Sequence, residues 1–363
     1  MSTRSYLSRS ELSNALAIRD LTDPADGPHA MQRLLDAIHA ALPVPVEVHR
    51  ASPIVSIADN YDRLGYPEGG AARDRRYTRY VCETALLRTQ TSAMIPPLLA
   101  RARTSADVVL SCAGLVYRRD VIDRLHVGEP HQVDLWRIAR RQLTVDDLHA
   151  MIGAVVGAAL PGVEWRTLAA VHPYTTNGLQ IDARVADEWV EIGECGLASS
   201  ALVHAPATGL AMGLGLDRLL MLRKGIPDIR LLRASDPRIA SQMQDLAPYR
   251  SVSMMPPVRR DLSIAVDEPV DVELLGDRVR AALGERAALV EAVELVSQTP
   301  GDELPATAIA RIGIAPGQLN ALVRVTLRAV DRSLTHAECN TLRDEIYREL
   351  HRGTAWQWVA TSR

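Results

Sequence analysis

Val116–Asp120 (VYRRD) and the run Glu129–Trp136 (EPHQVDLW) decide how this 363-residue chain is interpreted. Side chains two residues apart on a strand share a face, so Arg118 and Asp120 would point the same way on one strand. The side chains expected to share a face on the return strand are Gln132, Asp134 and Trp136. The sequence therefore predicts two neighbouring strands that carry one polar face.

The connection between these two strands, residues 121–131, is also polar and is longer than the roughly 2 to 5 residues of an ordinary hairpin turn. Guanidinium groups match phosphate oxygens, and carboxylates accept hydrogen bonds from an ammonium group. An arginine beside two acids and an amide would therefore suit a substrate that has both a phosphate and an amino group.

Length and composition favour a two-domain globular protein. The hydrophobic content of 47% is ordinary, and we find no apolar run long enough to cross a membrane and no apolar segment near Met1. We therefore expect a soluble, cytoplasmic protein with no membrane partner. The cysteines lack CxxC spacing, so we expect neither a disulfide framework nor a zinc site but reduced core thiols. They are Cys82, Cys112, Cys195 and Cys339.

The charge and the aromatic content are both unusual in detail. A net charge of -3 gives no general attraction to nucleic acid, so any RNA contact needs a local basic patch. Lys224 is the only lysine in the chain, and phenylalanine is absent. Tyrosine and tryptophan must supply every aromatic ring of the core.

Hydrophobic periodicity predicts alternating helices and strands through the first two thirds of the chain. Thr91 or Ser92 would either cap the helix that follows them or contact a substrate. The expected helices are 29–42, 94–103 and 145–160, and the expected strands are 46–48, 108–113, 164–171, 179–185 and 189–192.

Acidic side chains alternate with apolar ones on the later strands. Gln180 and Asp182 would share a face, and Glu191 lies between apolar neighbours. A buried acid is costly unless it is paired or binds a cation. These residues are therefore candidates for a metal or ligand site, and pairing with an internal arginine is the structural alternative.

The segment Gly209–Arg223 places glycines directly before a predicted helix, with Asp217 and Arg218 in its first turn. An arginine there opposes the helix dipole unless an anion lies nearby. Together with the arginine at position 118, this pattern points to a nucleotide.

From residue 249 onwards the pattern becomes βαββαβ, which is the order of a ferredoxin-like domain. The expected strands are 258–266, 289–297, 321–329 and 356–360, and the expected helices are 271–283 and 335–350. We therefore expect a domain over residues 1–248 and a separate one over 249–363.

These motifs resemble those of phenylalanyl-tRNA synthetases of the compact single-chain kind, which are class II aminoacyl-tRNA synthetases. Tyr117–Asp120 with His131–Asp134 resembles class II motif 2, and Gly213–Arg218 (GLGLDR) with Gly225–Arg230 (GIPDIR) resembles motif 3. The segment 87–92 resembles the substrate-binding turn, and 250–363 resembles the anticodon-binding domain. The likeness covers nearly the whole chain.

The resemblance implies an α+β fold in which helices flank an antiparallel sheet, plus a C-terminal ferredoxin-like βαββαβ domain. It also implies ATP-dependent activation of an aromatic amino acid as an aminoacyl adenylate, followed by transfer to tRNA, tRNA-Phe in the first instance. Arg118 and Arg218 would be catalytic and would hold ATP, with His126 at its outer phosphates. Glu191 would help to bind Mg2+.

The resemblance implies two further sets of contacts. The residues that would hold the amino acid are Ser92, Asp120, Gln132, Asp134, His172, Tyr174 and Ala211, the last as a small pocket floor. The residues that would bind tRNA are Arg259, Arg260, Arg324, Arg328 and Arg332, although this part of the chain has more acids than arginines and they could equally be solvated surface charge.

The departures from the family pattern leave the substrate open. His172-Pro-Tyr174 replaces Phe-Pro-Phe, Pro130 replaces a stacking Phe, Gln90 replaces His, and Glu194 replaces Gly. A chain without phenylalanine loses these rings in any case, so the substrate could still be phenylalanine. Alternatively, a more polar pocket selects a hydroxylated or heteroaromatic analogue.

Two further alternatives concern the role of the protein. It could be a spare, resistance or biosynthetic copy, or an amino-acid-activating or RNA-binding paralogue that no longer charges tRNA. Either a monomer or a homodimer fits the sequence.

Overall fold

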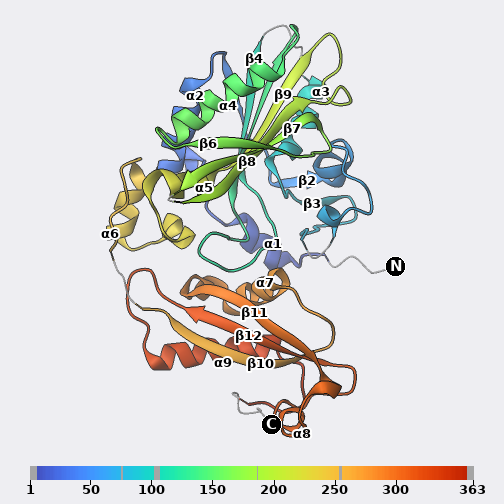
Figure 1. Ribbon diagram of the computed structural model, residues 1–363, viewed down its shortest axis with the longest axis vertical. Coiled ribbons are helices and arrows are strands. Elements are labelled where there is room, and N and C mark those ends of the chain that lie inside the picture. The colour runs from blue at the N-terminus through green and yellow to red at the C-terminus, as the bar shows by residue number, and fades with distance from the viewer. Residues whose placement is uncertain (1–5, 75–76, 102–106, 186, 253–255, 358–363) are drawn as a thin grey trace. The chain divides into compact units, whose positions relative to one another are not determined.

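A seven-stranded sheet organises the first part of the chain in the computed structural model (Figure 1). The structure describes residues 6–74, 77–101, 107–185, 187–252 and 256–357. The chain divides into two compact units. The first comprises Met1–Arg118, Glu129–Pro227 and Ala240–Tyr249, and the second comprises Arg119–Gly128, Asp228–Ile239 and Arg250–Arg363.

The large sheet has the strand order β1-β4-β5-β9-β8-β7-β6, in which β1 and β4 are parallel and the other neighbours are antiparallel. Its strands are β1 (Val46–His49), β4 (Val108–Leu115), β5 (His131–Ala139), β6 (Trp165–Ala169), β7 (Thr175–Val185), β8 (Glu188–Ala198) and β9 (Thr208–Gly215). A separate pair is formed by β2 (Ile54–Ser56) and β3 (Ala85–Leu87). The expected antiparallel-rich sheet is confirmed.

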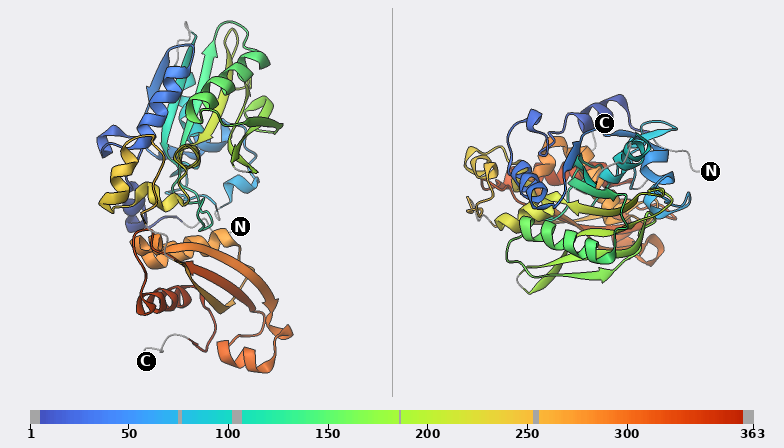
Figure 2. Two further views of the ribbon diagram at one scale, coloured as in Figure 1. Left: turned by 60° about the vertical axis from the view of Figure 1, so that its left-hand side comes forward. Right: turned by 90° about the horizontal axis from the view of Figure 1, so that it is seen from above.

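Helices cover one face of this sheet, where α2 and α4 pack against each other (Figures 1 and 2). Capping residues fix where they begin: the Thr144 hydroxyl accepts from the Asp147 backbone N–H at the start of α4, and Asp147 reaches back to Thr144. The helices assigned to this part of the chain are α1 (Arg9–Leu16), α2 (Ala30–Ala41), α3 (Ile95–Arg101), α4 (Val145–Ala159), α5 (Leu216–Lys224) and the short α6 (Pro237–Ala240).

Strand register separates the two faces of the sheet. Asp134 is paired with Cys112 on one side and with Gly213 on the other, and Gly213 is paired with Glu194, so these four side-chain positions share one face. The opposite face carries Ser111, whose hydroxyl lies 2.8 Å from Nε2 of His39 on α2. The polar strand residues predicted from the sequence therefore lie on the face turned away from α2.

The expected strand at Val116–Asp120 is wrong. Strand β4 ends at Leu115, and the backbone N–H of Tyr117 donates to the carbonyl of Arg88 (2.9 Å) rather than to β5. The chain leaves the sheet at this point, so Arg118 and Asp120 do not share the face of a strand. The return strand β5 is confirmed.

The second unit contains a three-stranded antiparallel sheet in the order β10-β12-β11. Its elements are β10 (Val258–Val266), α7 (Val272–Leu283), β11 (Val290–Pro300), α8 (Ala306–Ile312), β12 (Leu319–Leu327) and α9 (His336–Leu350). Helices α7 and α9 pack on one face of the strands around a shared apolar core (Figure 2). Helix α8 was not predicted. The expected final strand 356–360 is not formed at residues 356–357, and its remaining residues lie outside the described part of the chain.

A segment far away in sequence completes this unit. Ile122 belongs to the core formed by α7, α9 and the three strands, and its carbonyl accepts from the backbone N–H of Val293 (2.8 Å). The Arg280 guanidinium donates to the carbonyls of Asp120 and Val121, both at 2.7 Å. Arg119–Gly128 is therefore held by residues of the C-terminal part of the chain.

The prediction that all four cysteines are core thiols holds for three of them. Cys112, Cys195 and Cys339 are buried free thiols as expected, but Cys82 is exposed, so its prediction as a core thiol is wrong. Lys224 is buried and donates to the carbonyls of Asp245 (2.8 Å) and Ala247 (2.5 Å). Among the described helices, none has the length and hydropathy of a membrane span.

Candidate functional site

A buried carboxylate lies at the centre of the polar sheet face. Asp134 is 2% exposed and accepts hydrogen bonds from the hydroxyls of Thr91 (2.7 Å) and Ser92 (2.8 Å) and from Trp136 Nε1 (3.1 Å). Burial raises the pKa of this carboxyl above its ordinary value. Neither Thr91 nor Ser92 caps the following helical turn, which begins after Gln90, because both hydroxyls are directed at Asp134.

Aromatic rings stand beside this carboxylate. Tyr174 stacks on Trp136, with ring centroids 5.8 Å apart, and lies 6.3 Å from the rings of both Tyr66 and His172. Tyr174 also packs against the apolar cluster that contains Ala211, which is buried at the position expected of a pocket floor. The structure thus brings together five of the residues predicted for the amino acid: Ser92, Asp134, His172, Tyr174 and Ala211.

The two tyrosines of this group keep their phenolic protons at neutral pH. Burial raises the pKa of Tyr66 to about 12 and raises the pKa of Tyr174 well above its ordinary value. The Tyr66 hydroxyl donates to Oε1 of Gln90 (2.9 Å), the residue that replaces a family histidine. Hydroxyl groups, rather than charges, therefore border the aromatic part of the site.

Two of the departures from the family pattern contact each other. Nε2 of His172 lies 3.1 Å from Oε2 of Glu194, and Nδ1 of His172 lies 3.3 Å from the Thr175 hydroxyl. The hydrogen bond from His172 lowers the pKa of Glu194. Because Glu194 shares the sheet face of Asp134, this pair adds polar groups to the same side of the sheet.

Two arginines approach the polar face near Glu191. Nη1 of Arg218 donates to the carbonyl of Glu191 (2.8 Å), and Nε of Arg118 donates to the carbonyl of Thr89 (2.8 Å). Partial desolvation, followed by the charge of Glu194, raises the pKa of Glu191, while both arginines act in the opposite direction. A cation placed at Glu191 would therefore favour its ionised form.

Glycines leave the sheet surface open beside these charged groups. A Cβ atom at Gly213 would meet only the Asp134 carboxylate oxygens, both at 3.9 Å, and one at Gly215 would have no described atom within 4 Å. A ligand can therefore approach the backbone of β9 closely. Both glycines belong to the glycine run that the sequence singled out.

The other acid on this face has an internal partner. Asp182 accepts from Nε of Arg166 (3.0 Å) and from the Gln180 amide (2.7 Å). Of the two alternatives given from the sequence, Asp182 therefore follows the structural one, pairing with an arginine. No cluster of three metal-binding side chains occurs within the described ranges.

The remaining predicted site residues are distributed differently. Gln132 is half-buried on β5, on the same face as Asp134. Asp120 and His126 lie in Arg119–Gly128, which belongs to the second unit, and there Nδ1 of His126 lies 2.8 Å from Asp123. The roles expected for these three residues stay predictions.

The five arginines expected to bind tRNA do not form one stripe. Register places Arg260 opposite Val325, on the core-facing side of the sheet, whereas Arg259 and Arg324 belong to the other side. Three of the five have acidic partners within the unit: Arg324 with Asp261 (2.8 Å), Arg328 with Glu291 (2.6 Å) and Arg332 with Glu338 (2.8 Å). Their role in binding tRNA stays a prediction.

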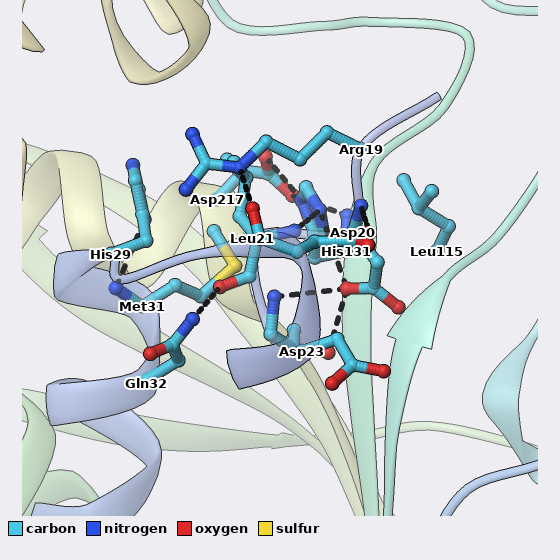
Figure 3. A network of polar contacts seen from close by, with 12 residues as sticks. Arg19, Asp20, Leu21, Asp23, His29, Met31, Gln32, Leu115, His131 and Asp217 are labelled. Carbon is cyan, nitrogen blue, oxygen red and sulfur yellow. Dashed lines mark hydrogen bonds and ion pairs between the residues drawn. The ribbon is translucent and has the colours of Figure 1, made fainter. Parts of the chain in front are cut away.

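Sequence reasoning missed Tyr66 and the partners of His131. Tyr66 lies in a loop with no periodic pattern, and no local signal distinguishes it. His131 bonds to Asp217 and to the backbone of Leu21 (Figure 3), contacts that span 86 and 110 residues. One indication of this contact is present in the sequence: His131 and Asp217 belong to the two segments, His131–Asp134 and Gly213–Arg218, that resemble family motifs.

One protein-family model matches a continuous range of the chain that contains most residues of this site. Residues 24–243 match the family model described as "tRNA synthetases class II core domain (F)". That range contains the large sheet and the residues grouped around Asp134.

Curated relatives extend the match along the chain. A chloroplastic/mitochondrial phenylalanine–tRNA ligase of Arabidopsis thaliana is 28% identical, covering 83% of this chain and 71% of that protein. A mitochondrial phenylalanine–tRNA ligase of Saccharomyces cerevisiae is 26% identical, covering 82% and 80%. The phenylalanine–tRNA ligase alpha subunit of Prochlorococcus marinus (strain MIT 9313) is 32% identical, covering 50% and 56%.

Proposed function

Because this chain belongs to the class II tRNA synthetase core domain family, we propose that it is an ATP-dependent aminoacyl-tRNA ligase for an aromatic amino acid, with phenylalanine as the first candidate substrate. The expected product of its first step is an aminoacyl adenylate, and tRNA is the acceptor of the second.

The observation that carries this proposal is the environment of Asp134. Three donors hold the carboxylate, and within the described residues no arginine, lysine or histidine forms a salt bridge with it. A buried carboxylate without a cation is unfavourable, and the ammonium group of an amino acid would supply the missing charge. The stacked rings of Tyr174 and Trp136 beside it suit an aromatic side chain.

The nucleotide would lie over the glycines of β9, between the two arginines. Arg118 would hold the α-phosphate and the reacting carboxylate, and Arg218 the triphosphate tail and the adenine. Class II synthetases use Mg2+ with ATP, and magnesium is commonly held by one or two carboxylates together with substrate phosphates. Glu191, whose pKa is raised by partial burial and by the nearby charge of Glu194, fits such a shared site.

The chemistry of the first step follows from this placement. A carboxylate oxygen of the amino acid bonds to the α-phosphorus of ATP while the bond from that phosphorus to the bridging oxygen breaks and pyrophosphate leaves. Arg118 and Arg218 would stabilise the charge that moves onto the leaving group, and Mg2+ would offset the charge of the triphosphate. The contribution of the protein is therefore placement and charge neutralisation.

ATP–pyrophosphate exchange with a panel of aromatic amino acids tests this function, followed by charging of total tRNA. We expect exchange that depends on an aromatic amino acid, and its loss in Arg118→Ala. Undiminished exchange in that variant would contradict the assignment of Arg118. Exchange without tRNA charging would instead identify an amino-acid-activating paralogue.

The contact between His172 and Glu194 favours a second candidate substrate, an aromatic amino acid with a hydroxyl or heteroatom on its ring. Side chains that can donate and accept hydrogen bonds discriminate strongly, since an apolar substrate leaves them unpaired. The double variant His172→Phe with Glu194→Gly restores the family pattern. If a polar analogue is the natural substrate, this variant should shift the preference towards phenylalanine, as the ratio of the two kcat/KM values measures. An unchanged ratio would reject the second candidate.

A further inference from the structure

A fully buried histidine joins three distant parts of the first unit. His131, the first residue of β5, is 0% exposed. Its Nε2 accepts from the backbone N–H of Leu21 (3.0 Å), and its Nδ1 lies 3.1 Å from Oδ1 of Asp217 on α5 (Figure 3). Because Nε2 is an acceptor here, the ring proton lies on Nδ1 and is donated to Asp217.

His131 contacts Asp217 through two groups. Asp217 is 4% exposed, and it accepts from the backbone N–H of His131 as well as from the imidazole. Its negative charge in the first turn of α5 also suits the helix dipole. The first turn of α5 is therefore fixed to the beginning of β5 by a buried carboxylate with a defined orientation.

Arg218 follows directly on the chain. Its guanidinium donates to the carbonyl of Glu191 and thereby stays beside the open glycine surface of β9. A shift of the first turn of α5 would move this guanidinium away from that surface. The placement of Arg218 thus depends on how Asp217, its neighbour in the first turn of α5, is held by His131.

The N-terminal segment anchors the histidine from its other side. Oδ1 of Asp20 accepts from the backbone N–H (2.9 Å) and the hydroxyl (2.7 Å) of Thr22, which shapes the turn that directs the Leu21 N–H at the imidazole. The Arg50 guanidinium in turn holds the carbonyl of Thr22. The imidazole therefore lies between two fixed partners rather than in an adaptable apolar space.

We infer that His131 is a positioning residue for the ATP-binding arginine: through its Nδ1–H bond to Asp217, it sets the first turn of α5 and hence the location of Arg218. This inference rests on the proposed role of Arg218 in holding ATP. It assigns the histidine no contact with either substrate.

Two conservative substitutions separate the two hydrogen bonds of the ring. The side-chain amide nitrogen of asparagine occupies the place of Nδ1, so His131→Asn keeps a donor for Asp217 and loses the acceptor for Leu21. The terminal amide of glutamine reaches the place of Nε2, so His131→Gln keeps a partner for Leu21 and loses the donor for Asp217. His131→Ala removes both bonds.

The test is steady-state ATP–pyrophosphate exchange together with thermal melting. We expect the KM for ATP to rise about tenfold in His131→Ala and His131→Gln, because a buried carboxylate loses a donor, and to stay within about twofold of wild type in His131→Asn. The KM for the amino acid should change little in all three variants. If His131→Ala does not fold, the volume-conserving Asn and Gln variants decide the question.

A purely structural histidine would give a different pattern. The three variants would then lose melting temperature and activity together, with equal effects on both KM values or with no advantage of Asn over Gln, and either result would overturn the inference. His39→Asn is the matched control, because it removes a histidine–hydroxyl contact on the helix-covered face, and it should lower the melting temperature without changing the KM for ATP.

Arg218→Ala separates this inference from the function on which it rests. A large rise in the KM for ATP in Arg218→Ala combined with normal kinetics in His131→Gln would reject only the positioning role. An unchanged KM for ATP in Arg218→Ala would reject the proposed nucleotide site itself.

Discussion

At the scale of single residues, Asp134 illustrates how a partly satisfied carboxylate can define a ligand. Three donors hold it in one orientation, yet burial raises its pKa, so this carboxyl is protonated more readily than an exposed one. An incoming ammonium group favours the ionised form. If Asp134 binds the ammonium group as proposed, binding of the amino acid is coupled to the release of a proton from Asp134.

We predict that the KM for the amino acid falls as the pH rises through the range above the ordinary carboxyl pKa of about 4. Asp134→Asn should remove this dependence and raise the KM about 10- to 100-fold, since it deletes a charge-assisted hydrogen bond in a buried place. ATP–pyrophosphate exchange assays over a range of about pH 5.5 to 8 measure both effects. Asp182→Asn, at a buried acid already paired with Arg166, is the control and should leave this KM unchanged; a pH-independent wild-type KM would contradict the coupling.

The same scale shows what the sequence could and could not predict about the site. Alternation on β5 correctly placed Asp134 and Trp136 on one face, because strand periodicity is a local property. The hydroxyls of Thr91 and Ser92 were identified as candidates, but their shared target lies more than 40 residues away. Local pattern identified these residues, whereas their pairing depends on how distant segments meet in the fold.

At the scale of elements, local chemistry fixes the ends of helices more reliably than the ends of strands. The predicted start of α9 at Thr335 agrees with the observed capping box, in which the Thr335 hydroxyl accepts from the Glu338 N–H (3.2 Å) and Glu338 reaches back to Thr335. The predicted strand at Val116–Asp120 failed because Tyr117 finds its hydrogen-bond partner on another segment.

We predict that Thr335→Ala lowers the free energy of unfolding of the second unit by about 1 kcal/mol, the typical cost of losing a helix cap. Thr341→Ala, in the middle of the same helix, is the matched control. Among the described residues its hydroxyl donates to the carbonyl of Ala337 alone, within the same helix, so the change should be within about 0.5 kcal/mol of zero. Urea unfolding of the two variants measures the difference, and equal losses would argue against the cap.

At the scale of the whole molecule, each compact unit contains a histidine whose pKa is lowered by burial. In the first unit this is His39, which contacts Ser111, and in the second it is His351, which accepts from the backbone N–H of Ala265 (3.0 Å) and stacks on Tyr347. A base with a lowered folded pKa is protonated first in the unfolded state, so its contribution is present above the unfolded pKa of about 6.5 and is lost as the pH falls.

We therefore predict that both units lose stability as the pH falls below about 6.5, because His39 and His351 are protonated more readily in the unfolded chain than in the folded one. Carboxyl groups near their ordinary pKa of about 4 titrate at lower pH, whereas burial raises the pKa of Asp134, so the histidine variants are needed to isolate the contribution of each histidine. His351→Asn should flatten the dependence in the second unit, and His39→Asn should do so in the first. Urea unfolding at several pH values tests this, and a slope that the variants leave unchanged would contradict it.

The domain bounds expected from the sequence stay a prediction, and they differ from the two compact units in where residues 119–128 and 228–239 belong. The change of pattern near residue 249 coincides with Tyr249 and Arg250, where the last segment of the first unit meets the longest segment of the second. The inclusion of Arg119–Gly128 in the second unit was not foreseeable, because it depends on Ile122 reaching the core of α7 and α9. Pattern within a segment cannot reveal a partner that lies 150 residues further along.

The buried position of Lys224 has a practical consequence. Lys224 is the only lysine of the chain, so a reagent that acylates primary side-chain amines has one target. The ammonium group of Lys224 is buried against the carbonyls of Asp245 and Ala247, which protect it from the reagent. The rate of acylation of Lys224 would then report how often the segment around residues 245–247 opens locally. It would measure local unfolding at one site without an engineered label.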